Sequence, residues 1–277
     1  MLKKIILSIL CFILFILLTT ASINIVTRNI FSKSTITQII DHISEKYEKE
    51  TNEKIFTATF TLGYQETDPK LKEYFDEDIL KEEIATILTN YFLVSADLIE
   101  IKELNTNNLE SLINKNISIY EKNTNKKIDR LYIDTLISEI NYNIQEINNF
   151  PKKASKIIKI IYSKKIYYIM IIICIICIIS IIFIKNNIIA AVKSISIRII
   201  FSGISLLSLG LALNSIFKNS DELIIKITNI ITENFYKIGG INLLIGIIIF
   251  IIARKNNLAN TNQINNQDVY HIQKDLN

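Results

Sequence analysis

Two cysteines lie three residues apart inside an unbroken apolar run. Residues 166–185 read IYYIMIIICIICIISIIFIK, which places Cys174 and Cys177 in the C-x-x-C spacing of redox and zinc sites. In a helix, residues three apart have Cβ atoms about 5 to 6 Å apart, whereas a disulfide needs about 3.5 to 4.5 Å. The pair therefore cannot form a disulfide unless the helix unwinds.

The same two cysteines lack the neighbours that a metal or thiolate site requires. No histidine lies in any of the long apolar runs, and the third cysteine, Cys11, is alone in a different run. A thiolate also needs a nearby cation or helix N-terminus, and the pair lies near the middle of its run. We interpret both as small apolar side chains and expect no metal ion and no cofactor.

Other candidates for catalysis are isolated. His42 falls on the polar side of a predicted helix, and His271 lies near the end of the chain in an Asn/Gln-rich stretch. Neither has a nucleophile or metal ligand at a recognisable spacing, and no glycine-rich phosphate loop, HExxH or GxSxG motif occurs. The carboxylates alternate with lysines as on a solvated helix face. The sequence therefore predicts a protein that is not an enzyme.

The composition indicates a membrane protein. Of 277 residues, 49% are hydrophobic, while only 6 are glycine, 2 are proline and none is tryptophan. Isoleucine, asparagine and lysine, which have A/T-rich codons, dominate, and we infer a bacterial genome rich in A and T. A net charge of +4 is too small to indicate a nucleic-acid partner.

Four stretches are long and apolar enough to cross a bilayer as helices, which requires about 20 residues. They are residues 5–26, 166–185, 199–217 and 238–253. The first could instead be a cleaved signal peptide, but it is longer than a usual signal core and no A-x-A-like site follows it. The predicted fold is an all-α membrane protein with four transmembrane helices and a mainly helical extracytoplasmic domain, residues 27–165, between the first two.

The positive-inside rule favours a multi-pass protein of the cell membrane with both termini in the cytoplasm. Residues 1–4, the loop 186–198 and the tail 254–277 would then be cytoplasmic, and they carry most of the flanking basic residues. One basic cluster lies on the opposite side, at the external end of the second span: Lys152, Lys153, Lys156, Lys159, Lys164 and Lys165. We expect these lysines to bind anionic lipid headgroups, with an acidic protein as the alternative partner.

Within residues 27–165, apolar side chains recur at helical spacing in four places, 36–47, 80–91, 109–120 and 133–147. A capping box of Thr35 and Gln38 is expected before the first of these. Two stretches, 55–62 and 97–102, alternate apolar and polar residues instead, which leaves a small pair of strands as an alternative.

Small and amide residues share one face of the third span and one face of the fourth. They are Gly203, Gly210 and Asn214, then Gly239, Asn242 and Gly246. Small residues let membrane helices approach closely and amides bond between them, so we predict that these faces pack together. Residues 218–237 are expected to form a helix whose apolar stripe lies on the outer membrane surface. The Asn/Gln-rich tail is expected to be disordered.

These patterns predict a non-enzymatic membrane protein whose external domain binds or senses a ligand, or acts as a scaffold, on a bundle of four spans. The order of elements, one span, an external domain and three spans, is similar to that of the four-span subunits of the FtsX and MacB class. That resemblance implies an alternative function, the coupling of a cytoplasmic ATPase to the exterior. The loop 186–198, with the apolar stripe Ile188, Ile189, Val192 and Ile195, would then contact the ATPase.

Overall fold

The computed structural model describes residues 2–61, 69–95, 104–145, 156 and 159–275. Every regular element in these stretches is helical, which confirms the all-α prediction for the part of the chain described. The chain forms two compact units. The first comprises Met1–Val26, Lys164–Ile216 and Thr232–Asn277, and the second comprises Thr27–Ser163 and Phe217–Ile231.

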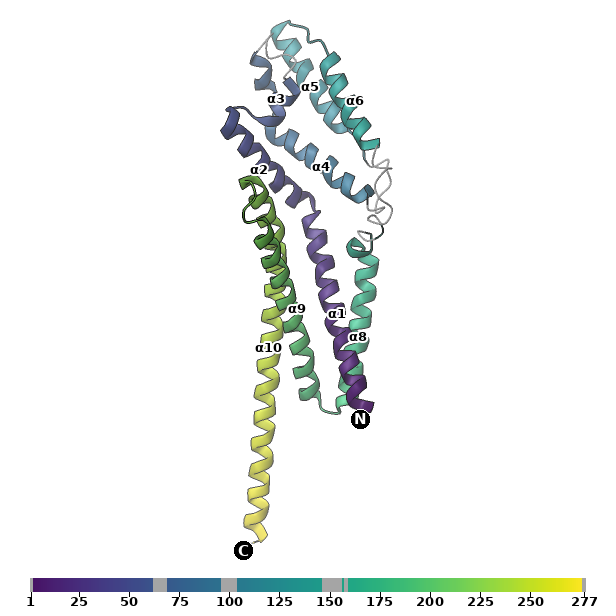
Figure 1. The fold of residues 1–277 in the computed structure, drawn as a ribbon, viewed down its shortest axis with the longest axis vertical. Coiled ribbons are helices and arrows are strands. Elements are labelled where there is room, and N and C mark those ends of the chain that lie inside the picture. The colour runs from purple at the N-terminus through teal and green to yellow at the C-terminus, as the bar shows by residue number, and fades with distance from the viewer. Residues whose placement is uncertain (1, 62–68, 96–103, 146–155, 157–158, 276–277) are drawn as a thin grey trace. The chain divides into compact units, whose positions relative to one another are not determined.

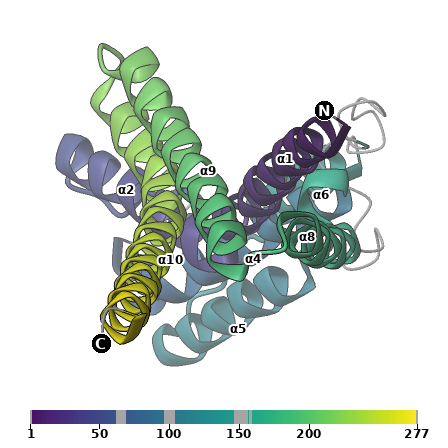
Figure 2. The ribbon, with the colours of Figure 1, turned by 90° about the horizontal axis from the view of Figure 1, so that it is seen from below.

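The first unit is built from long apolar helices. They are α1 (Leu2–Ile30), α8 (Lys164–Lys185), α9 (Ile188–Phe217) and α10 (Glu222–Asp275). Figure 1 shows them running alongside one another, and Figure 2 shows α1 next to α8 and α9 next to α10. Each contains a stretch long and apolar enough to cross a membrane, in agreement with the four stretches predicted from the sequence.

Two predicted segments differ from the structure. The expected loop 186–198 is reduced to a short turn, because α9 already begins at Ile188. The surface helix 218–237, the fourth span and the tail 254–277 form one helix, α10, from Glu222 to Asp275. No proline interrupts this sequence, and glycine within a helix costs only about 1 kcal/mol relative to alanine, so nothing in the chain forces a break.

Asparagines shape the turn between α8 and α9. Asn186 has a φ of 51°, the left-handed conformation that glycine usually adopts after a helix. The next residue, Asn187, caps α9 by accepting a hydrogen bond from the Ala190 amide at 3.0 Å. Lys185 Nζ closes the turn by donating to the Ala190 carbonyl at 3.0 Å and to Ser194 Oγ at 2.8 Å. In a chain with few glycines, asparagine thus supplies the tight reversal.

Shorter helices form the second unit. They are α2 (Lys33–Thr51), α3 (Ile55–Thr61), the 3-10 helix η2 (Pro69–Tyr74), α4 (Glu77–Ser95), α5 (Asn107–Thr124) and α6 (Leu131–Gln145). The apolar face of α2 packs through Ile36 and Ile40 against Ala85 of α4. The apolar faces of the other helices meet in one core: Phe60, Leu71, Phe75, Leu80, Leu109, Ile113, Ile117, Tyr120, Ile133 and Ile137. The helical spacing read from the sequence therefore identified most of the core-facing positions of α5 and α6.

One local prediction for this unit was wrong, and the structure decides against a strand at residues 55–61, which the sequence had left as an alternative. The capping residue of α2 is Ser32, whose side chain accepts from the Thr35 amide at 3.3 Å, rather than Thr35 itself. Residues 55–61 form the helix α3 and not a strand. The hydroxyl of Thr59 bonds back to the Ile55 carbonyl at 2.7 Å, which occupies the threonine in a helical turn. The second expected strand, 97–102, lies outside the described residues.

One buried carboxylate connects three helices of the second unit. Glu77, the first residue of α4, is 5% exposed. Its carboxylate accepts from the backbone amides of Phe56 and Thr57, at 3.2 and 2.9 Å, and so caps α3. It also accepts from the hydroxyls of Thr57, at 2.8 Å, and of Ser44 on α2, at 3.2 Å. A charge that would be unfavourable in the core is thus satisfied by four donors.

Glu77→Ala should destabilise the second unit strongly. The substitution leaves buried amide and hydroxyl donors without an acceptor, each of which costs about 1 to 3 kcal/mol. Thermal unfolding of the full chain in detergent, followed by circular dichroism, should show a lower midpoint for this variant. Glu139→Ala, which removes an exposed carboxylate from α6, is the control and should unfold like the wild type. Equal midpoints for the two variants would contradict the capping role.

Candidate functional site

An open cleft lies where α2, α3 and η2 meet in the second unit. Its volume is about 410 Å³, within the size range of pockets that bind small molecules. It is lined by Asn52, Glu53, Lys54, Thr57, Ala58, Lys72, Glu73 and Phe75. The sequence did not predict this cleft, because its residues come from separate elements and form no motif.

Helix termini position the cleft. Asn52 ends α2 with a φ of 58°, and its amide donates to the Glu48 carbonyl at 2.8 Å. This left-handed residue turns the chain sharply, so that α3 starts at Ile55 beside the end of α2. Thr57 is fixed by its hydrogen bonds to Glu77. The wall of the cleft is therefore held by the same carboxylate that caps α3.

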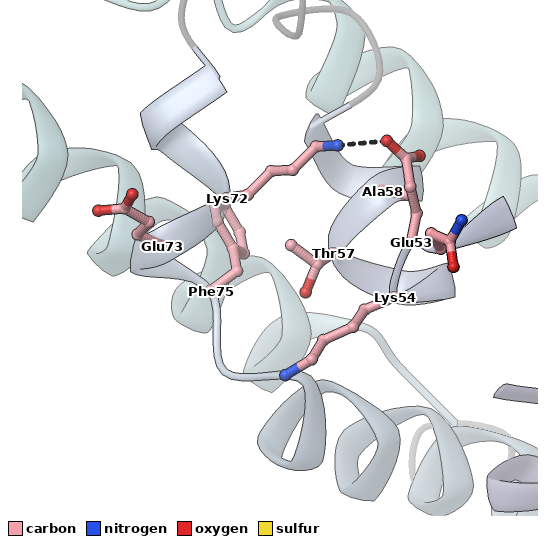
Figure 3. A pocket seen from close by; sticks show the side chains of 8 residues that line it. Glu53, Lys54, Thr57, Ala58, Lys72, Glu73 and Phe75 are labelled. Carbon is pink, nitrogen blue, oxygen red and sulfur yellow. Dashed lines mark hydrogen bonds and ion pairs between the residues drawn. The ribbon is translucent and has the colours of Figure 1, made fainter. Parts of the chain in front are cut away.

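Charged side chains lie on both sides of the cleft. Lys72 Nζ and Glu53 Oε1 form an ion pair at 2.6 Å across one side, and both side chains are about one third exposed. Figure 3 shows Lys54 extending along the other side toward Phe75, with Thr57 between the two. Lys54 forms no ion pair with any residue that the structure describes. The cleft thus combines an apolar floor, Ala58 and Phe75, with one available ammonium group.

No protein-family model, curated protein or solved structure matches this chain. The chemistry of the cleft is therefore inferred from its own residues. An ammonium group beside an apolar floor fits a small molecule that carries an anionic group on an apolar body. The Lys72–Glu53 pair offers a second, neutral contact that could separate to bind polar groups.

A second, smaller cleft of the same unit carries more charge. It measures about 200 Å³ and is lined by His42, Lys46, Lys49, Glu50, Glu222, Leu223 and Lys226. Lys46 Nζ contacts Asp221 Oδ1 at 2.8 Å beside it. This hydrogen bond raises the pKa of Lys46 and lowers the pKa of Asp221, so the pair stays ionised over a wide pH range. Because several of these charges are already paired, as in Lys46–Asp221 and Lys226–Glu222, the cleft is a weaker candidate for binding.

In the first unit, the structure brings together the glycines predicted to pack. A Cβ atom on Gly203 of α9 would lie 2.7 Å from the carbonyl oxygen of Gly239 on α10. One on Gly246 would lie 2.8 Å from the Ile200 backbone nitrogen, and one on Gly210 would lie 2.7 Å from the Tyr236 ring. Only glycine permits this approach, because the opposing atoms of the first two contacts are backbone.

The two predicted asparagines bond between the same helices. Asn214 Nδ2 of α9 donates to the Tyr236 hydroxyl of α10 at 2.9 Å, and its Oδ1 accepts from Thr232 at 3.1 Å. Asn242 Nδ2 of α10 donates to Ser22 of α1 at 2.8 Å and lies 3.5 Å from Ser202 of α9. The sequence predicted the contact between α9 and α10, but it did not predict that Asn242 also reaches α1.

The three cysteines share one buried cluster. Cys174 and Cys177 on α8 and Cys11 on α1 pack with Leu14 and Ile181, and all three thiols are free. Cys11 is alone in its own apolar run of the sequence, and the structure brings it beside the other two cysteines because α1 and α8 are neighbours. Among the described residues, no group of three or more His, Cys, Asp or Glu side chains is arranged to hold a metal ion.

The remaining predicted residues stay at the surface. Lys156, Lys159, Lys164 and Lys165 are exposed, whereas Lys152 and Lys153 lie outside the described residues. His42 contacts Glu45 at 3.3 Å on the surface of α2. His271 belongs to the last part of α10, whose side chains the structure does not describe. The structure does not gather these residues into one site.

Gly203→Ala should weaken the contact between α9 and α10. Because the added methyl meets backbone atoms of α10, the helices must separate, at a cost of about 1 to 3 kcal/mol. Gly240→Ala is the control: it adds the same methyl group to α10, beside Gly239 in the sequence, where nothing lies within 4 Å of the added Cβ. Thermal unfolding in detergent should give a lower midpoint for Gly203→Ala and an equal or higher one for Gly240→Ala. The reverse order would show that the close approach is not structurally important.

Proposed function

We propose that this chain is a non-enzymatic, multi-pass protein of the cell membrane whose second unit lies outside the cytoplasm and binds a small ligand. Both termini would be cytoplasmic. The four long apolar helices support membrane insertion. Basic residues at one end of these helices, including Lys3, Lys4 and Lys185, support the orientation.

The cleft beside Lys54 is the observation on which the binding proposal rests. Of the other charged residues that line the cleft, Lys72 and Glu53 pair with each other, and the carboxylate of Glu73 points away from the remaining lining side chains (Figure 3). Lys54 instead presents an ammonium group beside the apolar atoms of Ala58 and Phe75. We infer a ligand with a carboxylate at Lys54 and an apolar portion against Phe75.

The coupling of an ATPase is the less supported alternative. It requires an accessible apolar stripe at residues 188–195 for the contact with the ATPase. Ile195 is only 8% exposed and packs in the cluster that contains Cys11 and Cys174, whereas Ile188 is 69% exposed. One of the four residues of the stripe, Ile195, is therefore already packed within the bundle, which favours the binding function.

A thermal-shift screen of the full chain in detergent would test the ligand proposal. The probes are small carboxylates of increasing apolar size: acetate, butyrate, benzoate and N-acetyl-phenylalanine. At least one of the larger probes should raise the unfolding midpoint of the wild type, because a ligand that binds only the folded state stabilises it. Lys54→Ala should abolish that shift.

Lys122→Ala is the control, since Lys122 is an exposed lysine of α5 away from the cleft. It should show the same shift as the wild type. A shift that persists in Lys54→Ala, or that is lost equally in Lys122→Ala, would place binding elsewhere. No shift with any carboxylate would contradict the assignment of the ligand class.

A further inference from the structure

A groove between α1 and α9 in the first unit has a mixed apolar and cationic lining. Its volume is about 330 Å³, and it is lined by Ser8, Cys11, Phe12, Phe15, Arg198 and Phe201. The four residues from α1 are spaced by three and four and so share one helix face. Phe12 is 62% exposed and Phe201 is 50% exposed, so their rings lie at the outer surface of the helices. The groove thus offers aromatic walls with a single guanidinium group.

Arg198 has no anionic partner among the residues that the structure describes. Its side chain is half-buried and forms no ion pair or hydrogen bond with the residues that the structure describes. The stretch Lys164–Ile216, which contains it, has no acidic residue, and neither has Met1–Val26. Glu233, an acidic residue of the first unit on α10, is already paired with Lys237 at 2.8 Å. A partly buried guanidinium in apolar surroundings is stabilised by a bound anion, and the acidic residues described in this unit do not supply one.

The position of Arg198 along α9 matches the depth of lipid phosphates. Residues 199–217 carry no charge, and at 1.5 Å per residue they rise about 29 Å. That length equals the hydrocarbon core of a bilayer, about 30 Å. If these residues span the core, Arg198 lies at its boundary with the headgroups. Phe201 lies about one turn deeper, at the level of the acyl chains.

We propose that this groove binds one anionic phospholipid, with its phosphate at Arg198 and an acyl chain along Phe12, Phe15 and Phe201. The inference rests on the membrane insertion of the proposed function, but not on the ligand cleft of the second unit. Charge complementarity favours a lipid over a helix of a second copy, because the spans of another copy would bring no acidic residue to Arg198. This site is distinct from general attraction of surface lysines to headgroups, since it is stoichiometric and depends on one arginine.

Native mass spectrometry of the detergent-purified full chain can test the site. The protein is titrated with phosphatidylglycerol and, separately, with phosphatidylcholine of the same acyl chains. The first phosphatidylglycerol should bind more tightly than the first phosphatidylcholine. Arg198→Gln should weaken that first binding step about tenfold, as expected for the loss of one charge-assisted contact of about 1.5 kcal/mol. Phe201→Ala should weaken the binding of both lipids by removing part of the acyl-chain wall.

Arg254→Gln is the matched control, because Arg254 is an exposed arginine of the same unit outside the groove. It should keep the wild-type affinity for the first phosphatidylglycerol. Arg198→Lys retains the charge and should keep the preference for phosphatidylglycerol. This second variant tests the proposal if Arg198→Gln does not fold.

Equal affinities for the first phosphatidylglycerol in wild type and Arg198→Gln, or loss of the preference in Arg198→Lys, would overturn the proposal. The proposal would also be overturned if the lipid-free wild type formed dimers and Phe201→Ala dissociated them, because a second copy of the chain would then occupy the groove. A chain that is recovered from membranes but lacks the preference would refute the lipid site and leave membrane insertion intact.

Discussion

The apolar outer surface of α1, α8, α9 and α10 is the constraint on which the rest of the structure depends. Only 22% of the most hydrophobic stretch of α1, and 11% of that of α10, is buried within the protein. Isoleucines such as Ile172 and Ile248 are more than half exposed. In water this surface would be unfavourable by about 25 cal/mol per Å², whereas in lipid it carries no such penalty and each helix satisfies its own backbone hydrogen bonds.

Membrane insertion, as proposed above, would explain why the two units are held together differently. Between membrane helices there is no hydrophobic driving force, so association depends on close packing and on hydrogen bonds. The first unit accordingly uses backbone contact at Gly203 and Gly239, and the amide of Asn242. The second unit has an apolar core, as expected in water, and a buried carboxylate, Glu77, that fixes its helix termini. The candidate cleft lies beside that carboxylate, where termini of separate helices meet.

The sequence was sufficient where a pattern is local and repeats. Apolar length identified the four long helices, and three-and-four spacing identified the core faces of α5 and α6, because both follow directly from helix geometry. It failed where the outcome depends on contacts between distant residues. Glu77 was recognisable as an acidic residue at a helix start, but not as the cap of α3, which lies some twenty residues earlier. Likewise, the alternation in residues 55–61 left a strand open as an alternative, because the tertiary cap that stabilises the helix α3 cannot be read from the sequence. The candidate cleft could not be predicted at all, since its residues are close together only after folding.

Insertion of the four long helices into a bilayer is the central claim for this protein. Alkaline carbonate extraction of membranes from cells expressing the full chain measures this, because it releases peripheral and soluble proteins but not proteins whose helices span the lipid. We predict that the chain stays entirely with the membrane pellet after carbonate treatment and enters solution only when detergent is added. Recovery of the folded chain in the carbonate supernatant, or in the soluble fraction without detergent, would contradict membrane insertion of the four helices.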